Sequence, residues 1–151
     1  MQEELVPLID EIIKYGMRSD FNSKKNIYEL EKALAVLYSF YLSNDFFGDD
    51  VEYPDFEKQN FSFVEENVNL NFPSFGDYKY FNNPNSLNET IDILYGNAKN
   101  DLVEVIFDLL QVKFNFQNYG DIAGENIFEV LFSINTRKKI LNLLNYLYFY
   151  K

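Results

Sequence analysis

Carboxylates are the side chains of this sequence that could do chemistry, because its 151 residues include no histidine and no cysteine. The chain therefore cannot build a Ser-His-Asp triad, a cysteine nucleophile, a histidine general base or a Cys/His zinc site. Its six glycines stand mostly apart, so it also has no glycine-rich phosphate loop. Paired Asp and Glu side chains remain, and these could in principle hydrolyse glycosides or hold Mg²⁺ or Ca²⁺.

The densest group of carboxylates lies in residues 43–61, SNDFFGDDVEYPDFEKQNF. A calcium loop has oxygen ligands at alternate positions, glycine at the sixth position and glutamate at the twelfth. Counted from Asp45, the fourth residue is Gly48 and the twelfth is Phe56; counted from Asp49, the sixth is Pro54. The spacing fits no metal loop, so we expect no metal, no cofactor and no catalytic residue here.

The same stretch mixes acids with aromatics, a composition typical of a surface that binds a protein. The carboxylates would steer a basic partner, and the aromatic side chains would supply the desolvated anchors of the interface. The residues that we expect to contact the partner are Asp45, Phe46, Phe47, Asp49, Asp50, Glu52, Tyr53, Asp55 and Phe56. The alternative is a solvated connection whose aromatics fold back onto the rest of the molecule.

Two further charged groups lie on predicted helices. Asp101, Glu104 and Asp108 share one helix face, and we expect a solvated stripe, because a di-iron bundle would need Glu-x-x-His pairs. Three cations, Arg137–Lys139, follow Thr136 in the first turn of a predicted helix, where the macrodipole disfavours positive charge. We expect these cations to pair with the protein's own carboxylates rather than with an external anion.

Hydrophobic spacing predicts helices along most of the chain. They are expected over 3–15, 23–43, 61–72, 86–96, about 100–117, 123–135 and 136–147. Gly16 is expected to end the first helix, Ser86 and Glu89 to form a capping box, and Thr136 to cap the last helix. The helix ending near 117 is apolar nearly all round, which places it at the centre of a bundle. The sequence thus predicts one all-α domain over residues 1–151, with six to seven helices and an irregular acidic and aromatic connection at about 44–85.

Three short motifs lie within residues 75–148: DYKYFNNP, DLVEVIFDLLQ and FSINTRKKILNLLNYL. They resemble a bacterial helical family known only as a domain of unknown function. In that family an extended aromatic segment ending in proline leads to a helix of the form Asp-Leu-x-x-Ile-x-x-Asp-Leu, and a helix pair closes the chain. The family's closing-helix tryptophan and terminal histidine are absent here. The resemblance implies an all-α bacterial protein and carries no activity with it.

The formal net charge of −11 narrows the possible partners. A field of that sign repels phosphates, so we expect neither nucleic acid nor an anionic membrane as a partner. The N-terminus, MQEELVPLID, lacks the features of a secretory signal, and the longest apolar run, residues 33–42, is too short to span a bilayer. We therefore expect a cytoplasmic protein.

These observations favour a small acidic protein-binding module that is not an enzyme. Its profile resembles that of bacterial immunity proteins, which neutralise a toxin or effector by binding and masking it. The expected partner is one protein with a basic surface, such as a toxin or effector domain. The alternative is a helical domain of unknown function that acts as an adaptor or small-ligand binder, without catalysis.

Overall fold

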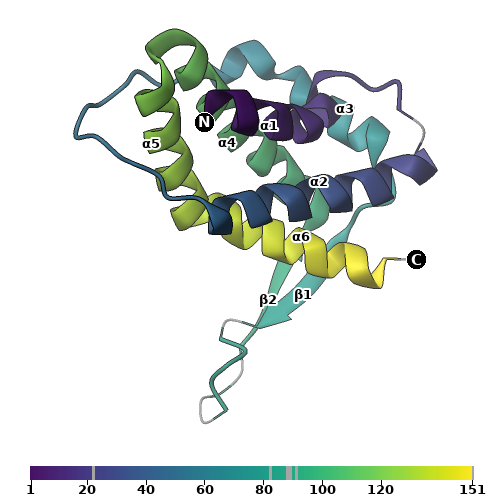
Figure 1. The fold of residues 1–151 in the computed structure, drawn as a ribbon. Coiled ribbons are helices and arrows are strands. Elements are labelled where there is room, and N and C mark those ends of the chain that lie inside the picture. Colours follow the sequence, from purple (N-terminus) through teal and green to yellow (C-terminus); the bar gives the residue numbers. More distant parts are fainter. Residues whose placement is uncertain (22, 82, 88–89, 91, 151) are drawn as a thin grey trace.

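A computed structural model describes the protein over residues 1–21, 23–81, 83–87, 90 and 92–150. Its elements are α1 (Gln2–Met17), α2 (Ser23–Ser43), α3 (Phe63–Asn71), β1 (Asp77–Phe81), β2 (Ile93–Asn97), α4 (Ala98–Tyr119), α5 (Asp121–Leu131) and α6 (Arg137–Phe149). The helices pack into one bundle, from which the two strands project as a hairpin (Figure 1). The mostly helical fold is confirmed, whereas the prediction of a purely all-α fold is wrong.

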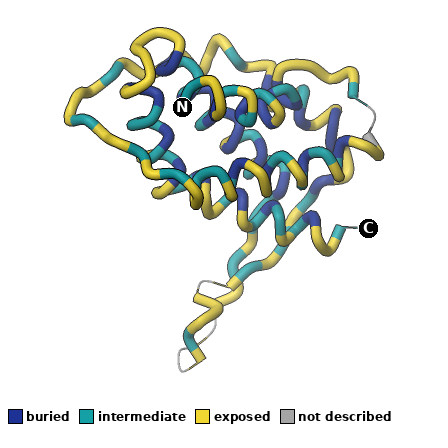
Figure 2. Tube along the Cα trace, in the orientation of Figure 1, coloured by how far each residue is buried: buried dark blue, intermediate teal, exposed yellow. Residues whose placement is uncertain are grey.

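The helix α4 forms the centre of the bundle, because α1, α3, α5 and α6 all pack against it. Ile106 and Leu109 are buried in its middle, and Leu102 and Val105 are buried one turn earlier. Figure 2 shows that the helices turn their buried residues toward one another and their exposed residues outward. Each fully buried Leu or Ile side chain contributes about 1.5–3 kcal/mol to the free energy of unfolding. The prediction that this nearly all-apolar helix lies at the centre is therefore confirmed.

Gly120 turns the chain from α4 into α5. Its φ of 91° lies in the region that glycine adopts without a steric cost. From α5 the chain continues without a break through a π-helical segment, Phe132–Thr136, into α6. The chain changes direction at this segment (Figure 1), as helices commonly do at π-turns. The α-helices of the described residues thus form five continuous segments rather than six to seven, and none of them is long and apolar enough to cross a membrane.

Thr136 lies inside this continuous helical segment, so the prediction that it caps the last helix is wrong. Its backbone is helical, with φ −59° and ψ −42°, and its side chain is buried. Its Oγ1 donates a hydrogen bond to Asp108 Oδ2 at 2.7 Å. Because a helical turn precedes Arg137, the cations that follow do not face the free N-terminal dipole that the sequence suggested.

The prediction of a helix over residues 86–96 is also wrong, because residues 93–97 form β2 and pair antiparallel with β1. Tyr78 lies opposite Gly96, and a Cβ at residue 96 would come within 2.3 Å of Tyr78 Cζ. The ring thus covers the glycine, and the Tyr78 hydroxyl donates a hydrogen bond to Asp101 in the first turn of α4. Glu89 of the expected capping box lies outside the described residues.

The helix α1 continues through Gly16 to Met17, so Gly16 does not act as the predicted C-cap. It instead lies at a close contact with α3 and α4. A Cβ at this position would be 2.9 Å from Val64 Cγ1 and 3.0 Å from Ile106 Cγ2. Gly16 therefore lets three helices approach one another.

Two asparagines of α3 complete the hydrogen bonds at the end of α1, where carbonyls have no partner within the helix. Asn67 Nδ2 donates to the Gly16 carbonyl at 2.8 Å. Asn71 Nδ2 donates to the carbonyls of Tyr15 and Arg18 at 2.8 and 2.7 Å. These bonds fix α3 across the end of α1.

Candidate functional site

Residues 44–57, named the acidic loop here, run outside the bundle past α5 (Figure 1). Several aromatic contacts hold the loop to the helices, and two of them mark its path. The Phe46 ring lies 5.0 Å from the Phe128 ring of α5, and the Tyr53 ring lies 5.4 Å from the Tyr119 ring at the end of α4. Residues 44–57 are irregular, as predicted, and the loop is attached to the bundle at both of these points. The rest of the predicted irregular connection, to about residue 85, contains α3 and β1 instead.

The four aromatics of the loop differ in their exposure. Phe56 is only 5% exposed and packs against Phe61 and Phe107, so its ring is turned into the molecule rather than toward a partner. Phe46 and Tyr53 are half-buried, whereas Phe47 is 75% exposed. Three aromatics fold back onto the bundle, as the alternative prediction states, and they leave Phe47 as the one that projects.

Apart from Glu57, which accepts a hydrogen bond from Asn60 Nδ2 at 3.3 Å, the carboxylates of the loop divide into two groups. Asp49 Oδ2 accepts a hydrogen bond from the Tyr53 hydroxyl at 2.6 Å, which raises the pKa of Tyr53 above its ordinary value. Asp55 Oδ1 accepts from Gln111 Nε2 of α4 at 2.8 Å. These two acids fix the shape of the loop.

Asp45, Asp50 and Glu52 form the second group. All three are exposed, and within the described part of the chain they make no hydrogen bond or ion pair. The neighbouring cation, Lys58, places its Nζ 5.8 Å from the centre of the Phe107 ring instead of beside these acids. The charge of the three carboxylates is therefore directed to solvent.

The helix α5 adds to the surface that the loop begins. Gly48 lies so close to α5 that a Cβ there would be 2.8 Å from Asn126 Oδ1. One helical turn to either side of Asn126, at i−4 and i+4, are Ile122 and Val130, both exposed. The loop and α5 thus place exposed apolar side chains beside acids, and the acids that α5 contributes are Asp121, Glu125 and Glu129.

The acids of α4 do not form the predicted solvated stripe. Asp108 is partly buried and accepts hydrogen bonds from Thr136 Oγ1 at 2.7 Å and from Asn135 Nδ2 at 3.2 Å. Loss of solvent raises the pKa of Asp108 above its ordinary value, although both hydrogen bonds act in the opposite direction. The carboxylate fastens the π-helical segment to α4.

A second cluster joins the root of the hairpin to α4 and α6. Tyr78 donates to Asp101, and Lys139 is paired with Glu104. Burial raises the pKa of Tyr78 and of Asp101 and lowers the pKa of Lys139. Perturbed groups of this kind often mark active sites, but here each polar end has a partner within the protein. Among the described residues, no group of three or more Asp and Glu side chains could hold a metal ion.

The cations at 137–139 contact aromatic rings as well as a carboxylate. Lys139 pairs with Glu104, as the sequence predicted for these residues. Arg137 Nε donates to the Tyr38 hydroxyl at 3.0 Å, and Lys138 Nζ lies 5.6 Å from the centre of the Tyr80 ring. The prediction of pairing with the protein's own carboxylates therefore holds for Lys139, whereas tyrosines take the other two contacts.

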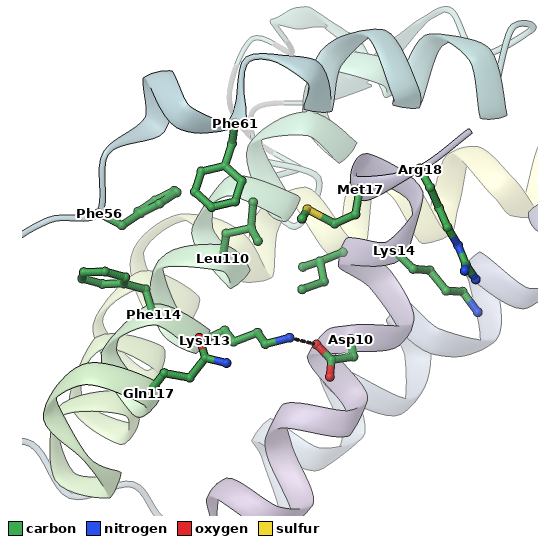
Figure 3. Close-up of a pocket in the computed structure, with 11 residues that line it drawn as sticks. Asp10, Lys14, Met17, Arg18, Phe56, Phe61, Leu110, Lys113, Phe114 and Gln117 are labelled. Atoms are coloured by element: carbon green, nitrogen blue, oxygen red, sulfur yellow. Dashed lines mark hydrogen bonds and ion pairs between the residues drawn. The ribbon is translucent and has the colours of Figure 1, made fainter. Parts of the chain in front are cut away.

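A cavity of about 490 Å³ lies between α1, α4 and the end of the acidic loop with the residues that follow it, Phe56 and Phe61 (Figure 3). Its apolar walls are Ile13, Met17, Phe56, Phe61, Leu110 and Phe114. At one edge Lys113 Nζ and Asp10 Oδ1 form an ion pair at 2.7 Å, with Gln117 beside them. The cavity combines apolar walls with a few polar groups, as small-molecule sites do.

Sequence reasoning missed this cavity, and the residues explain why. Asp10 and Lys113 are 103 positions apart, so no spacing rule could pair them. Phe56 was noticed, but as part of a partner surface rather than as a cavity wall. The apolar face of the predicted central helix indicates that its side chains are buried. It does not indicate that a cavity remains beside them.

Comparison with protein-family models found no match to this chain, and comparison with curated proteins found none either. Among solved structures, the chain is similar to the crystal structure of protein BF1032 from Bacteroides fragilis. The TM-score is 0.70 at 16% sequence identity, over 97% of this chain and 89% of that chain. A likeness at this identity shows a shared fold and transfers no function.

Proposed function

We propose that this protein is a non-catalytic binding module that inhibits one basic protein partner by covering its surface, in the manner of a bacterial immunity protein. The observation that carries the proposal is the exposed ring of Phe47, presented on a loop that is attached on both sides. An aromatic side chain that is held out to solvent by a fixed loop suits an interface anchor, because little ordering is needed on binding.

The surrounding charge supports a basic partner. Asp45, Asp50 and Glu52 lie on the same loop without internal partners in the described residues, and the net charge of the chain is −11. Such a surface speeds the approach of a cationic protein and repels nucleic acid and anionic membranes. Under this proposal the protein acts in the cytoplasm and masks a toxin or effector domain.

The test begins with capture of partners from the source cells and continues with binding kinetics of the recovered protein. Asp45→Asn, Asp50→Asn and Glu52→Gln together should lower the association rate roughly ten-fold at low salt, and less at physiological salt. The matched control is Glu3→Gln, Glu65→Gln and Glu66→Gln, which removes the same charge from exposed positions on α1 and α3. Equal effects of the two sets would reject the acidic loop as the binding surface.

A second pair of variants tests the anchor. Phe47→Ala should raise the dissociation rate by roughly thirty-fold or more, the loss of about 2 kcal/mol expected at a hot spot, without changing the melting temperature. Leu70→Ala, at another exposed apolar residue, should change neither quantity. Restored growth of cells that express the partner, when this protein is co-expressed, would distinguish inhibition of a toxin from adaptor binding.

The alternative function, an adaptor or small-ligand binder resembling the helical family of unknown function, has support from a different surface. On the hairpin, Phe81 lies opposite Ile93, and both side chains are exposed, as is that of Tyr95. A two-stranded sheet has unpaired backbone groups at its outer edges, to which an extended peptide can add. Tyr95→Lys should abolish binding if the hairpin is the interface and leave it unchanged if the acidic loop is.

A further inference from the structure

The walls of the cavity between α1 and α4 are mostly apolar. Phe56, Phe61 and Phe114 line one side, with Leu110 and Met17 beside them (Figure 3). Ile13 also lines the cavity. The volume of about 490 Å³ falls within the range of sites that hold drug-sized ligands. The walls therefore favour an apolar body, aromatic or aliphatic.

The polar edge of the cavity favours an anion over a cation. The Lys113 side chain is 26% exposed and that of Asp10 is 45% exposed, so water screens the carboxylate more than the ammonium. An ammonium has three N–H donors, and the bond to Asp10 accounts for one of them. A ligand within the cavity thus meets a cation with free donor capacity.

The remaining charges near the cavity are compatible with this preference. Lys14 and Arg18 turn their charged ends away from the aromatic walls (Figure 3), and they pair with Glu11 and Asp20. Asp10 stands four residues before Lys14 on α1, the spacing at which an acid and a lysine attract each other. Lys14 already pairs with Glu11 at 2.7 Å, however, so Lys113 is the cation that a ligand in the cavity meets.

We propose that this cavity binds a small, free amphiphile with an apolar body and one anionic head of the carboxylate class. The apolar body lies against the phenylalanine walls, and the head accepts hydrogen bonds from Lys113 Nζ and from the Gln117 amide. The free molecule is the source, because a net charge of −11 opposes docking on an anionic bilayer. Of the acidic loop, only the buried Phe56 lines this cavity, and the exposed residues Asp45, Phe47, Asp50 and Glu52 do not.

The test measures the binding of decanoate, decanol and decylammonium to the full chain by displacement of the fluorescent anion 8-anilinonaphthalene-1-sulfonate. Decanoate should bind about ten-fold more tightly than decanol, as expected for one charge-assisted hydrogen bond, and decylammonium more weakly than either. Vesicles of phosphatidylglycerol should not co-sediment the protein.

Two variants locate the site. Lys113→Met should lower the affinity for decanoate about ten-fold and leave that for decanol unchanged. Met17→Trp, at a partly exposed wall residue, should weaken both by filling the space. The matched control is Lys32→Met, in a second cavity of about 340 Å³ between α1 and α2, where Glu11 and Glu29 accompany the lysine. It should change neither affinity, and melting curves should show all three variants folded.

Several results would overturn the proposal. These are no binding of decanoate at about 1 mM, equal affinities for decanoate and decanol, tighter binding of decylammonium, or no effect of Met17→Trp in a folded protein. Co-sedimentation with the vesicles would show that the protein binds a lipid surface, and it would overturn the proposal of a free ligand. Asp45→Asn with Asp50→Asn and Glu52→Gln should leave decanoate binding unchanged, so a failure of the acidic-loop proposal would not affect this one.

Discussion

At the scale of single residues, the buried Tyr15 and the half-buried Tyr78 show how much a hydrogen-bond partner matters. The Tyr15 ring packs against Phe21 and Phe72, but its hydroxyl is buried and has no hydrogen-bond partner among the described residues. Burial raises its pKa to about 12. The hydroxyl of Tyr78, by contrast, donates to the Asp101 carboxylate. Two side chains of the same type thus make opposite polar contributions to the free energy of unfolding.

Replacing each tyrosine by phenylalanine separates these contributions. Tyr15→Phe removes an unpaired buried hydroxyl, so the free energy of unfolding should stay the same or rise by up to about 1 kcal/mol. Tyr78→Phe removes a bond to a charged group and should lower it by about 1.5–3 kcal/mol. Urea unfolding of both variants measures the difference, and a larger loss for Tyr15→Phe would show that its hydroxyl has a partner.

At the scale of elements, the close approach of α1 to α3 and α4 depends on the missing side chain of Gly16. Gly16→Ala should lower the free energy of unfolding by about 1–3 kcal/mol, because its Cβ would press on Val64 and Ile106. Gly76→Ala is the matched control, since no atom lies within 4 Å of the added Cβ. It should leave stability unchanged or raise it by about 0.4–1 kcal/mol. Chemical denaturation of both variants is the measurement, and equal losses would contradict the packing role.

The helices show which elements a sequence can predict. The sequence predicts a helix from Ser23 to about Ser43, which matches α2, and its apolar circumference places α4 at the centre. Local periodicity and capping residues carry that information. The hairpin depends on contacts between residues far apart in the chain. Tyr78 covers Gly96, and its hydroxyl donates a hydrogen bond to Asp101. Periodicity within one segment contains no such contact.

The candidate sites follow the same division. The acidic loop was located from composition, but the burial of Phe56 depends on Phe61, Phe107 and Phe114, whose positions only the fold determines. The ion pair at the cavity joins α1 to α4 and has no local signature. Composition therefore identifies the chemistry that the chain lacks and the charged loop, whereas the cavity depends on contacts that only the fold makes.

At the scale of the whole molecule, negative charge is found both outside and inside the bundle. The exposed acids of the loop keep their contact with water, whereas Asp101 and Asp108 give up part of theirs between α4 and its neighbours. Loss of solvent raises the pKa of both groups above the ordinary 3.8, against the opposing effect of their hydrogen bonds. Both carboxylates therefore hold a proton more readily in the folded protein than in the unfolded chain.

This difference predicts that the protein gains stability as the solution is acidified from neutral pH. Between the raised folded pKa values and 3.8, the folded state binds more protons than the unfolded state, so the free energy of unfolding rises as pH falls through that window. The net charge of −11 acts in the same direction, because protonation relieves repulsion among the acids. Melting curves from about pH 7 to about pH 4 measure the effect.

Asp101→Asn with Asp108→Asn should reduce this rise in stability. The control, Asp45→Asn with Asp50→Asn, removes the same charge from exposed positions and should retain most of the rise. Identical slopes for the two variants would mean that surface repulsion, and not the two interior carboxylates, sets the pH dependence of stability.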